Sequence, residues 1–102
     1  MYTVGLGELK FEWDEAKSRA NRSKHRVTFN EAASAFLDEF ARIIPDPEHS
    51  DEEQRLLLLG TSGLFNVLVV CHCYRIDDDV IRIISARRAD KSERNEYAEY
   101  LP

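Results

Sequence analysis

The sequence lacks the long apolar segment that a membrane helix requires. Its longest apolar run, residues 64–71, is interrupted by Asn66, whereas a spanning helix needs about 20 consecutive residues. The first ten residues contain no basic segment followed by an apolar one, so no signal peptide is evident. We therefore expect a cytoplasmic protein without a membrane segment.

Cysteine is scarce, and the familiar catalytic and metal-binding motifs are absent. If Cys71 and Cys73 lie on one strand, they share a face but are too far apart to bond to each other, so we expect them to be small core residues. Neither His49 nor His72 has a second ligand at the spacing of a zinc site. The sequence contains no Walker loop, GxGxxG, GxSxG or HExxH motif. We predict no metal and no cofactor.

Charge of neither sign dominates, but the charges are unevenly distributed. The 102 residues, the usual size of one domain, carry a net charge of −5. Five Lys or Arg residues and His25 fall within residues 17–26, without an acid, and five more basic residues lie within 82–94. Residues 38–53 contain seven acids and one Arg. A single domain spanning 1–102 can therefore have one basic and one acidic surface. Because the basic surface can bind an anion by itself, an anionic partner is compatible with the negative net charge.

Two helices are predicted in the N-terminal half. Residues 1–10 contain Gly5 and Gly7 and are expected to be an irregular lead-in. Asp14 would cap a mostly polar first helix that ends near His25. Its inward-facing candidates are Trp13, Ala16 and Ala20.

The second helix carries a stronger signal. Thr28 and Glu31 match the S/T-x-x-E capping box at its start. Apolar residues follow at helical spacing and predict one buried face: Phe29, Ala32, Ala33, Phe36, Leu37 and Phe40.

After Ala41 the pattern becomes that of strands. We predict strands at 42–44, 55–59, 64–76 and 80–86, separated by Pro45-Asp46-Pro47, by residues 60–63 and by a polar turn at 77–79. Such short connections favour an antiparallel meander. Asp90 and Glu93 predict a capped final helix as far as Leu101. The predicted fold is α+β: two helices, about four antiparallel strands and one helix.

Arginines are concentrated around the last predicted strand. Strict alternation would place Arg82 and Arg88 on one face and Arg87 on the other, and hairpin pairing would bring Arg75 near Arg82. Guanidinium groups suit phosphate oxygens because they donate several hydrogen bonds in a fixed fork. The alternative is a salt-bridged sheet edge in which the acids at 77–79 are the partners.

Lys24 and His25 end the first predicted helix. The helix dipole favours cations there, which is a sufficient structural explanation. Alternatively, His25 acts as a general acid or base. RNA permits cleavage without a metal because its own 2′-hydroxyl can attack the phosphate, and the protein then supplies position, proton transfer and charge stabilisation. His25, Glu93 and Tyr97 are the candidates for proton transfer.

Two stretches of the chain resemble the BrnT family of toxins. The first comprises Phe11-Glu12-Trp13-Asp14, Lys17, Asn21, Lys24-His25, Val27-Thr28-Phe29 and Glu31-Ala32, and the second comprises residues 82–89, Glu93-Arg94 and Tyr97. The resemblance implies a RelE-like fold and an endoribonuclease that stops translation. It also implies a hetero-oligomer with a BrnA-type antitoxin, which binds operator DNA. We expect an acidic or mixed segment of that antitoxin to cover Arg75, Arg82 and Arg88.

The resemblance also suggests roles for individual residues. It implies catalytic roles for Arg75, Arg82, Arg87 and His25, and substrate-binding roles for Lys24, Arg88 and Tyr97. The family tends to have Gly where this chain has Arg26. A left-handed helix end would strain Arg26 by roughly 1 kcal/mol, unless the helix ends differently. Two other classes stay open: a binding module for RNA or a partner that does not cut, and a structural subunit that assembles through its acidic segment 38–53.

Overall fold

The computed structural model describes residues 1–47, 54–75 and 79–102. Within them the chain forms six strands, three α-helices and one 3-10 turn, which confirms the α+β class and the three helices. In chain order the elements are β1 (Tyr2–Leu6), β2 (Leu9–Trp13), α1 (Glu15–His25), α2 (Phe29–Ser34), η1 (Ala35–Leu37), β3 (Arg42–Pro45), β4 (Leu56–Thr61), β5 (Val67–Tyr74), β6 (Ile81–Arg88) and α3 (Lys91–Ala98). The predicted turn at 77–79 and the acidic segment 38–53 lie partly outside the described residues.

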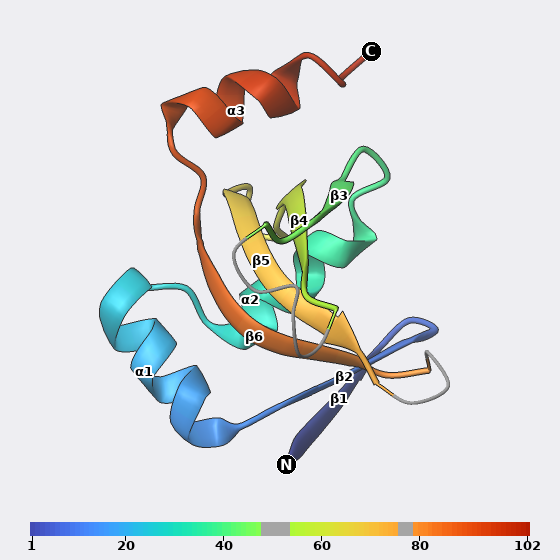
Figure 1. Cartoon of the computed structure of the whole chain (residues 1–102), viewed down its shortest axis with the longest axis vertical. Helices are drawn as coiled ribbons and strands as arrows, with labels where there is room; N and C mark the ends of the chain where they lie inside the picture. Colours follow the sequence, from blue (N-terminus) through green and yellow to red (C-terminus); the bar gives the residue numbers. More distant parts are fainter. Residues whose placement is uncertain (48–53, 76–78) are drawn as a thin grey trace.

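The strands form one mixed sheet in the order β1-β2-β6-β5-β4-β3. The antiparallel meander predicted after Ala41 is confirmed, because each of β3 to β6 pairs antiparallel with the next. In Figure 1, α1 lies beside β6, α2 lies against the sheet, and α3 lies beyond the end of β6. No helix among the described residues is long and apolar enough to cross a membrane.

The irregular lead-in predicted for residues 1–10 is wrong, because they form a hairpin. β1 and β2 pair antiparallel around Gly7, whose φ of 61° suits a residue without a side chain. Apolar residues alternate along β2, and Phe11 and Trp13 are buried. β2 also pairs in parallel with β6, which extends the predicted sheet by two strands. Trp13 is therefore the last residue of a strand and not an inward residue of the first helix.

The first helix is confirmed, but its contact with the sheet is polar. Asp14 accepts hydrogen bonds from the backbone N–H groups of Ala16 and Lys17. Ala16 and Ala20 are exposed, whereas Asn21 is buried. The Asn21 amide donates to the carbonyl of Ala86 at 2.9 Å, and its oxygen accepts the N–H of Ala86 at 3.0 Å. This pair of hydrogen bonds fixes α1 on β6.

The second helix is shorter than predicted. α2 ends at Ser34, and the chain continues as the 3-10 turn η1, so the predicted helical stripe to Phe40 is interrupted and Leu37 is exposed. The η1 turn packs closely on Gly60 of β4, where an added Cβ would lie 3.1 Å from the carbonyl oxygen of Ala35. The predicted capping box is half correct. Thr28 caps the N–H of Glu31, but the Glu31 carboxylate accepts bonds from Ser62 and Asn66 of the β4–β5 connection.

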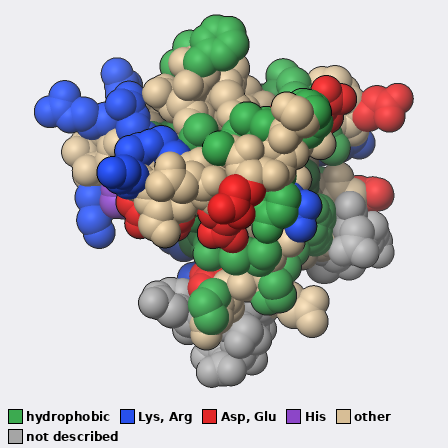
Figure 2. Space-filling model, turned by 90° about the horizontal axis from the view of Figure 1, so that it is seen from above, with side chains coloured by type: hydrophobic (Ala, Val, Ile, Leu, Met, Phe, Trp, Pro, Cys, Tyr) green, Lys and Arg blue, Asp and Glu red, His purple; other side chains and the backbone are tan. Residues whose placement is uncertain are grey.

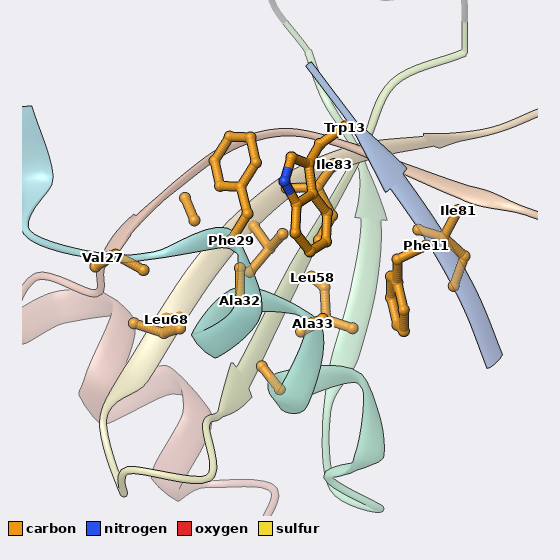
Figure 3. Close-up of a cluster of buried hydrophobic side chains, with 13 residues drawn as sticks. Phe11, Trp13, Val27, Phe29, Ala32, Ala33, Leu58, Leu68, Ile81 and Ile83 are labelled. Carbon is orange, nitrogen blue, oxygen red and sulfur yellow. The ribbon is translucent and has the colours of Figure 1, made fainter. Parts of the chain in front are cut away.

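The main core lies between α2 and one face of the sheet. Figure 3 shows Phe29 of α2 beside Trp13 of β2, and their ring centroids are 5.9 Å apart. Leu68 of β5 and Ile83 of β6 complete this cluster from the sheet. Because neighbouring residues of a strand point to opposite faces, Val69, Cys71 and Cys73 of β5 face away from α2.

A β-bulge changes the predicted faces of β6. Cys71 pairs with Ser85, but His72 pairs with Ile83, so one extra residue lies in β6. Arg82 and Arg87 are opposite Cys73 and Val69, and therefore both lie on the face away from α2. The prediction that Arg82 and Arg87 lie on opposite faces is wrong, because the bulge shifts the alternation by one residue.

Candidate active site

A cavity of about 300 Å³ lies on the sheet face away from α2. Its lining includes His25 from the end of α1, Ser85 and Arg87 from β6, Cys71 from β5, and Asp46 and Arg55 from the segments beside β3 and β4. His25 and Arg87 were both predicted from the sequence as catalytic residues. The structure therefore brings two of the four predicted catalytic residues to one cavity.

Arg87 is held in a fixed orientation by Glu93. Two guanidinium nitrogens of Arg87 donate to the two carboxylate oxygens of Glu93, at 2.7 and 2.9 Å. Glu93 also closes the capping box of α3 by accepting the N–H of Asp90. The hydrogen bonds from Arg87 lower the pKa of Glu93, and the same bonds raise the pKa of Arg87. Glu93 is therefore a weak proton acceptor, and its main effect is to position Arg87.

His25 reaches the cavity because Asn21 anchors the helix one turn earlier. Asn21 and His25 are four residues apart, so they lie on neighbouring positions of one helix face. Asn21 bonds to the backbone of Ala86, which precedes Arg87 in β6. The half-buried His25 is thereby placed beside the same segment of β6.

Asp46 and Cys71 form the inner wall of the cavity. Asp46 is buried, and the Cys71 thiol donates a hydrogen bond to its carboxylate at 3.7 Å. Burial, together with the charge of Asp46, raises the pKa of Cys71 to about 11. The thiol is therefore protonated near neutral pH and is a poor nucleophile. The prediction that both cysteines are core residues is confirmed, since both are buried.

Arg75 and Arg82 meet at a second site on β6, as the sequence predicted, but their shared partner is Glu12 of β2. The Glu12 carboxylate lies 3.2 Å from Arg75 Nε and 3.4 Å from Arg82 Nη2. Arg82 Nε is buried without a hydrogen-bond partner in the described part of the chain. Arg82 and Arg87 are five residues apart on β6, which corresponds to about 16 Å. The predicted arginine array is thus divided into two groups.

The predicted substrate-binding residues lie in different environments. Lys24 and Arg88 are exposed at the end of α1 and the end of β6. Tyr97 is 5% exposed and does not line the cavity. Its hydroxyl donates to Asp38 and accepts a bond from Thr61 at 3.0 Å. Burial and the bond to Asp38 raise the pKa of Tyr97, so its phenol stays protonated.

Three residues of these sites were missed by sequence analysis: Glu12, Asp46 and Arg55. Glu12 alternates with Phe11 and Trp13, and this period of two was the available signal for a strand. Asp46 stands between two prolines and was assigned only to a break between strands. Nothing in the pattern distinguished Arg55 from other strand residues. Within residues 1–47, 54–75 and 79–102, no group of three His, Cys, Asp or Glu side chains is placed to hold a metal ion.

Comparison with known proteins identifies one family. Residues 13–93 match the family model described as "Ribonuclease toxin, BrnT, of type II toxin-antitoxin system". The crystal structure of the ribonuclease toxin BrnT from Brucella abortus is similar to this chain, with a TM-score of 0.62 and 24% sequence identity over 79% of this chain and 96% of that one. At this identity the likeness supports the fold. No curated protein sequence matches this chain.

Proposed function

The chain belongs to the BrnT family of ribonuclease toxins of type II toxin–antitoxin systems, and on this basis we propose that it is an endoribonuclease that cleaves RNA without a metal ion and so inhibits translation. The observation that carries the proposal is the cavity that His25 and Arg87 line together. A group able to transfer a proton and a fixed cation are the two elements that metal-free RNA cleavage requires.

In the proposed reaction the 2′-hydroxyl oxygen attacks the adjacent phosphorus. The new O–P bond gives a 2′,3′-cyclic phosphate, and the P–O bond to the 5′ oxygen of the next nucleotide breaks. His25 takes the 2′-hydroxyl proton, and the leaving 5′ oxygen takes a proton from water. Arg87 stabilises the charge that develops on the phosphate oxygens, and it is already oriented by Glu93.

The remaining predicted residues have supporting roles in this proposal. Lys24 contacts the RNA backbone beside the cavity. Arg88 is opposite Leu68, on the other face of the sheet, so it contacts the RNA only at the exposed end of β6. Arg75 and Arg82 bind a more distant part of the RNA, since two guanidiniums share one carboxylate and leave an excess positive charge. Tyr97 has no contact with the substrate in the proposed reaction and instead fixes α3 through Asp38 and Thr61.

A type II toxin has a cognate antitoxin as its partner. We propose a BrnA-type antitoxin that forms a hetero-oligomer with the toxin in the cytoplasm and makes all contacts to operator DNA. An acidic or mixed segment of it would cover Arg75, Arg82 and Arg88, because complementary charge steers association. A structure of the complex in which these three side chains stay solvent-exposed would contradict this part of the proposal.

Single-turnover cleavage of single-stranded RNA, with the protein saturating and a chelator present, tests the function. The parent should cleave, and His25→Ala should cleave on the order of 10²-fold more slowly, within the range for loss of a general acid or base. Lys91→Ala, an exposed change on α3, is the matched control and should cleave at the parental rate. Cleavage that requires an added metal would refute the metal-free mechanism. RNA binding without cleavage would favour the non-catalytic binding module.

A further inference from the structure

The outer side of α1 carries three arginines that the cavity does not use. Arg19, Arg22 and Arg26 line an open hollow of about 680 Å³ together with Ser23 and Thr28. Figure 2 shows Lys and Arg side chains gathered at the left of the molecule, the side on which Figure 1 places α1. None of the residues that line this hollow also lines the cavity of His25 and Arg87.

The chemistry of this hollow fits a phosphate backbone better than a protein surface. Its lining consists of three guanidinium groups and two hydroxyl groups, without a carboxylate or an apolar side chain. Among the described residues, no carboxylate forms an ion pair with any of the three arginines. Protein interfaces usually have a desolvated core with aromatic or other apolar anchors. Contacts to a nucleic-acid backbone need only cations and hydrogen-bond donors.

Arg26 occupies a backbone conformation that disfavours it. Its φ of 58° and ψ of 29° are left-handed, and its N–H donates to the carbonyl of Arg22 at 2.9 Å to end the helix. Glycine is the residue favoured at such a helix end. At this position the chain instead has an arginine. Its long side chain is exposed to solvent and forms no ion pair with a described neighbour. The cap hydrogen bond uses only the backbone of Arg26, so the retention of this side chain at a strained position supports a role in binding.

We propose that Arg19, Arg22 and Arg26 form a docking surface for the sugar–phosphate backbone of single-stranded RNA, outside the cavity. This inference rests on the proposed function, in which RNA is the substrate. RNA held on α1 is adjacent to Lys24 and His25 at the end of the same helix, so this surface guides the strand toward the cavity.

The first test measures binding of a single-stranded RNA with 2′-O-methyl groups, which cannot be cleaved because the attacking hydroxyl is blocked. The variant Arg19→Ala/Arg22→Ala/Arg26→Ala is compared with Lys10→Ala/Lys17→Ala/Lys91→Ala, which removes the same charge from exposed positions that do not line the hollow, one of them on α1 itself. Each neutralised phosphate of a single strand contributes about 0.7 to the slope of log K against log salt. The arginine variant should therefore lose about 2 from this slope and about 100-fold in affinity at 0.1 M salt. The lysine variant should lose much less.

The second test separates binding from folding at Arg26. Arg26→Gly should raise Tm by a few degrees, because it relieves the left-handed strain. The same change should weaken RNA binding by about 5-fold at 0.1 M salt. Arg26→Lys keeps the charge and the strain, so it should bind RNA within about 2-fold of the parent without a gain in Tm. A change in Tm without a change in affinity would overturn a binding role for Arg26.

The outcomes distinguish this inference from the proposed function. If the parent cleaves RNA but the arginine variant binds it as tightly as the parent does, the inference is wrong and the function stands. If the parent binds RNA without cleaving it and the arginine variant loses that binding, the function is wrong and the inference stands. Unchanged RNA binding together with weaker binding of poly-glutamate would overturn the inference in favour of an acidic protein partner.

Discussion

At one end of β6, Arg82 shares the carboxylate of Glu12 with Arg75, whereas at the other end Arg87 pairs with both oxygens of Glu93, one of which also accepts the N–H of Asp90. Two cations on one anion leave an excess positive charge and one buried nitrogen without a partner. A bidentate pair is neutral and rigid, and it fixes the direction of the guanidinium. The same residue type on one strand is therefore suited to holding an anion at one end and to positioned chemistry at the other.

The strongest test of this difference between the two ends is to replace Arg87 and Arg82 separately with alanine. Arg87→Ala should slow single-turnover cleavage at saturating protein by about 10²–10³-fold, the usual loss for a donor that stabilises the transition state. Arg82→Ala should weaken RNA binding and reduce its salt dependence, with less than about 10-fold effect on the saturated rate. Circular dichroism would verify that both variants are folded. Equal rate losses in both variants would show that the two ends do not differ in function.

The second comparison concerns stability at the Glu12 end. Glu12→Ala should lower the free energy of unfolding by about 2–3 kcal/mol, because it leaves two arginines without their counter-charge, one of them largely buried. Glu8→Ala, at an exposed position of the same hairpin, should change it by less than about 0.5 kcal/mol. Urea denaturation measures both values. A Glu12 variant as stable as the Glu8 variant would mean that the ion pairs do not hold β2 on β6.

The smallest expected effect is a pH dependence of the stability that the Arg87–Glu93 pair contributes at its end of β6. Hydrogen bonds from Arg87 lower the pKa of Glu93 below its ordinary value of about 4.5. Its ion pair therefore stabilises the fold fully above that value, and the contribution is lost as the pH falls through the lowered pKa. Glu93→Gln keeps the cap but removes the charge, so the parent should be more stable by about 0.5–1 kcal/mol at pH 6. Thermal unfolding between pH 6 and pH 2.5 should show this difference decrease toward the acidic end, and a constant difference would contradict the assignment.

Sequence patterns predicted the features of this fold that depend on near neighbours. Asp14 and Asp90 were identified as helix caps because a cap acts within three residues. The N-terminal hairpin was missed because Gly5 and Gly7 were taken as signs of irregular structure, although Gly7 is the turn itself. The alternation of Leu9, Phe11 and Trp13 contained the missing information.

The candidate site was less predictable because it depends on contacts between distant residues. The bulge that places Arg82 and Arg87 on one face arises from the pairing of β5 with β6, and no local signal in β6 marks it. The role of Glu12 depends on a strand pairing that periodicity does not reveal. Asp46 and Arg55 reach the cavity only after β3 and β4 have joined the sheet. His25 and Arg87, which line the cavity, were predicted as site residues from their chemistry and not from their position in the fold.

The parallel pairing of β2 with β6 has a consequence for the order of events during synthesis. Glu12 and Arg82 are 70 residues apart in the chain. At a synthesis rate of about 5–20 residues per second, β6 is made roughly 4–14 s after β2. Through that interval the N-terminal hairpin has no strand on which to pack, and neither arginine group of β6 exists. A nascent chain therefore carries neither arginine group, and no assembled candidate site, until β6 has been made.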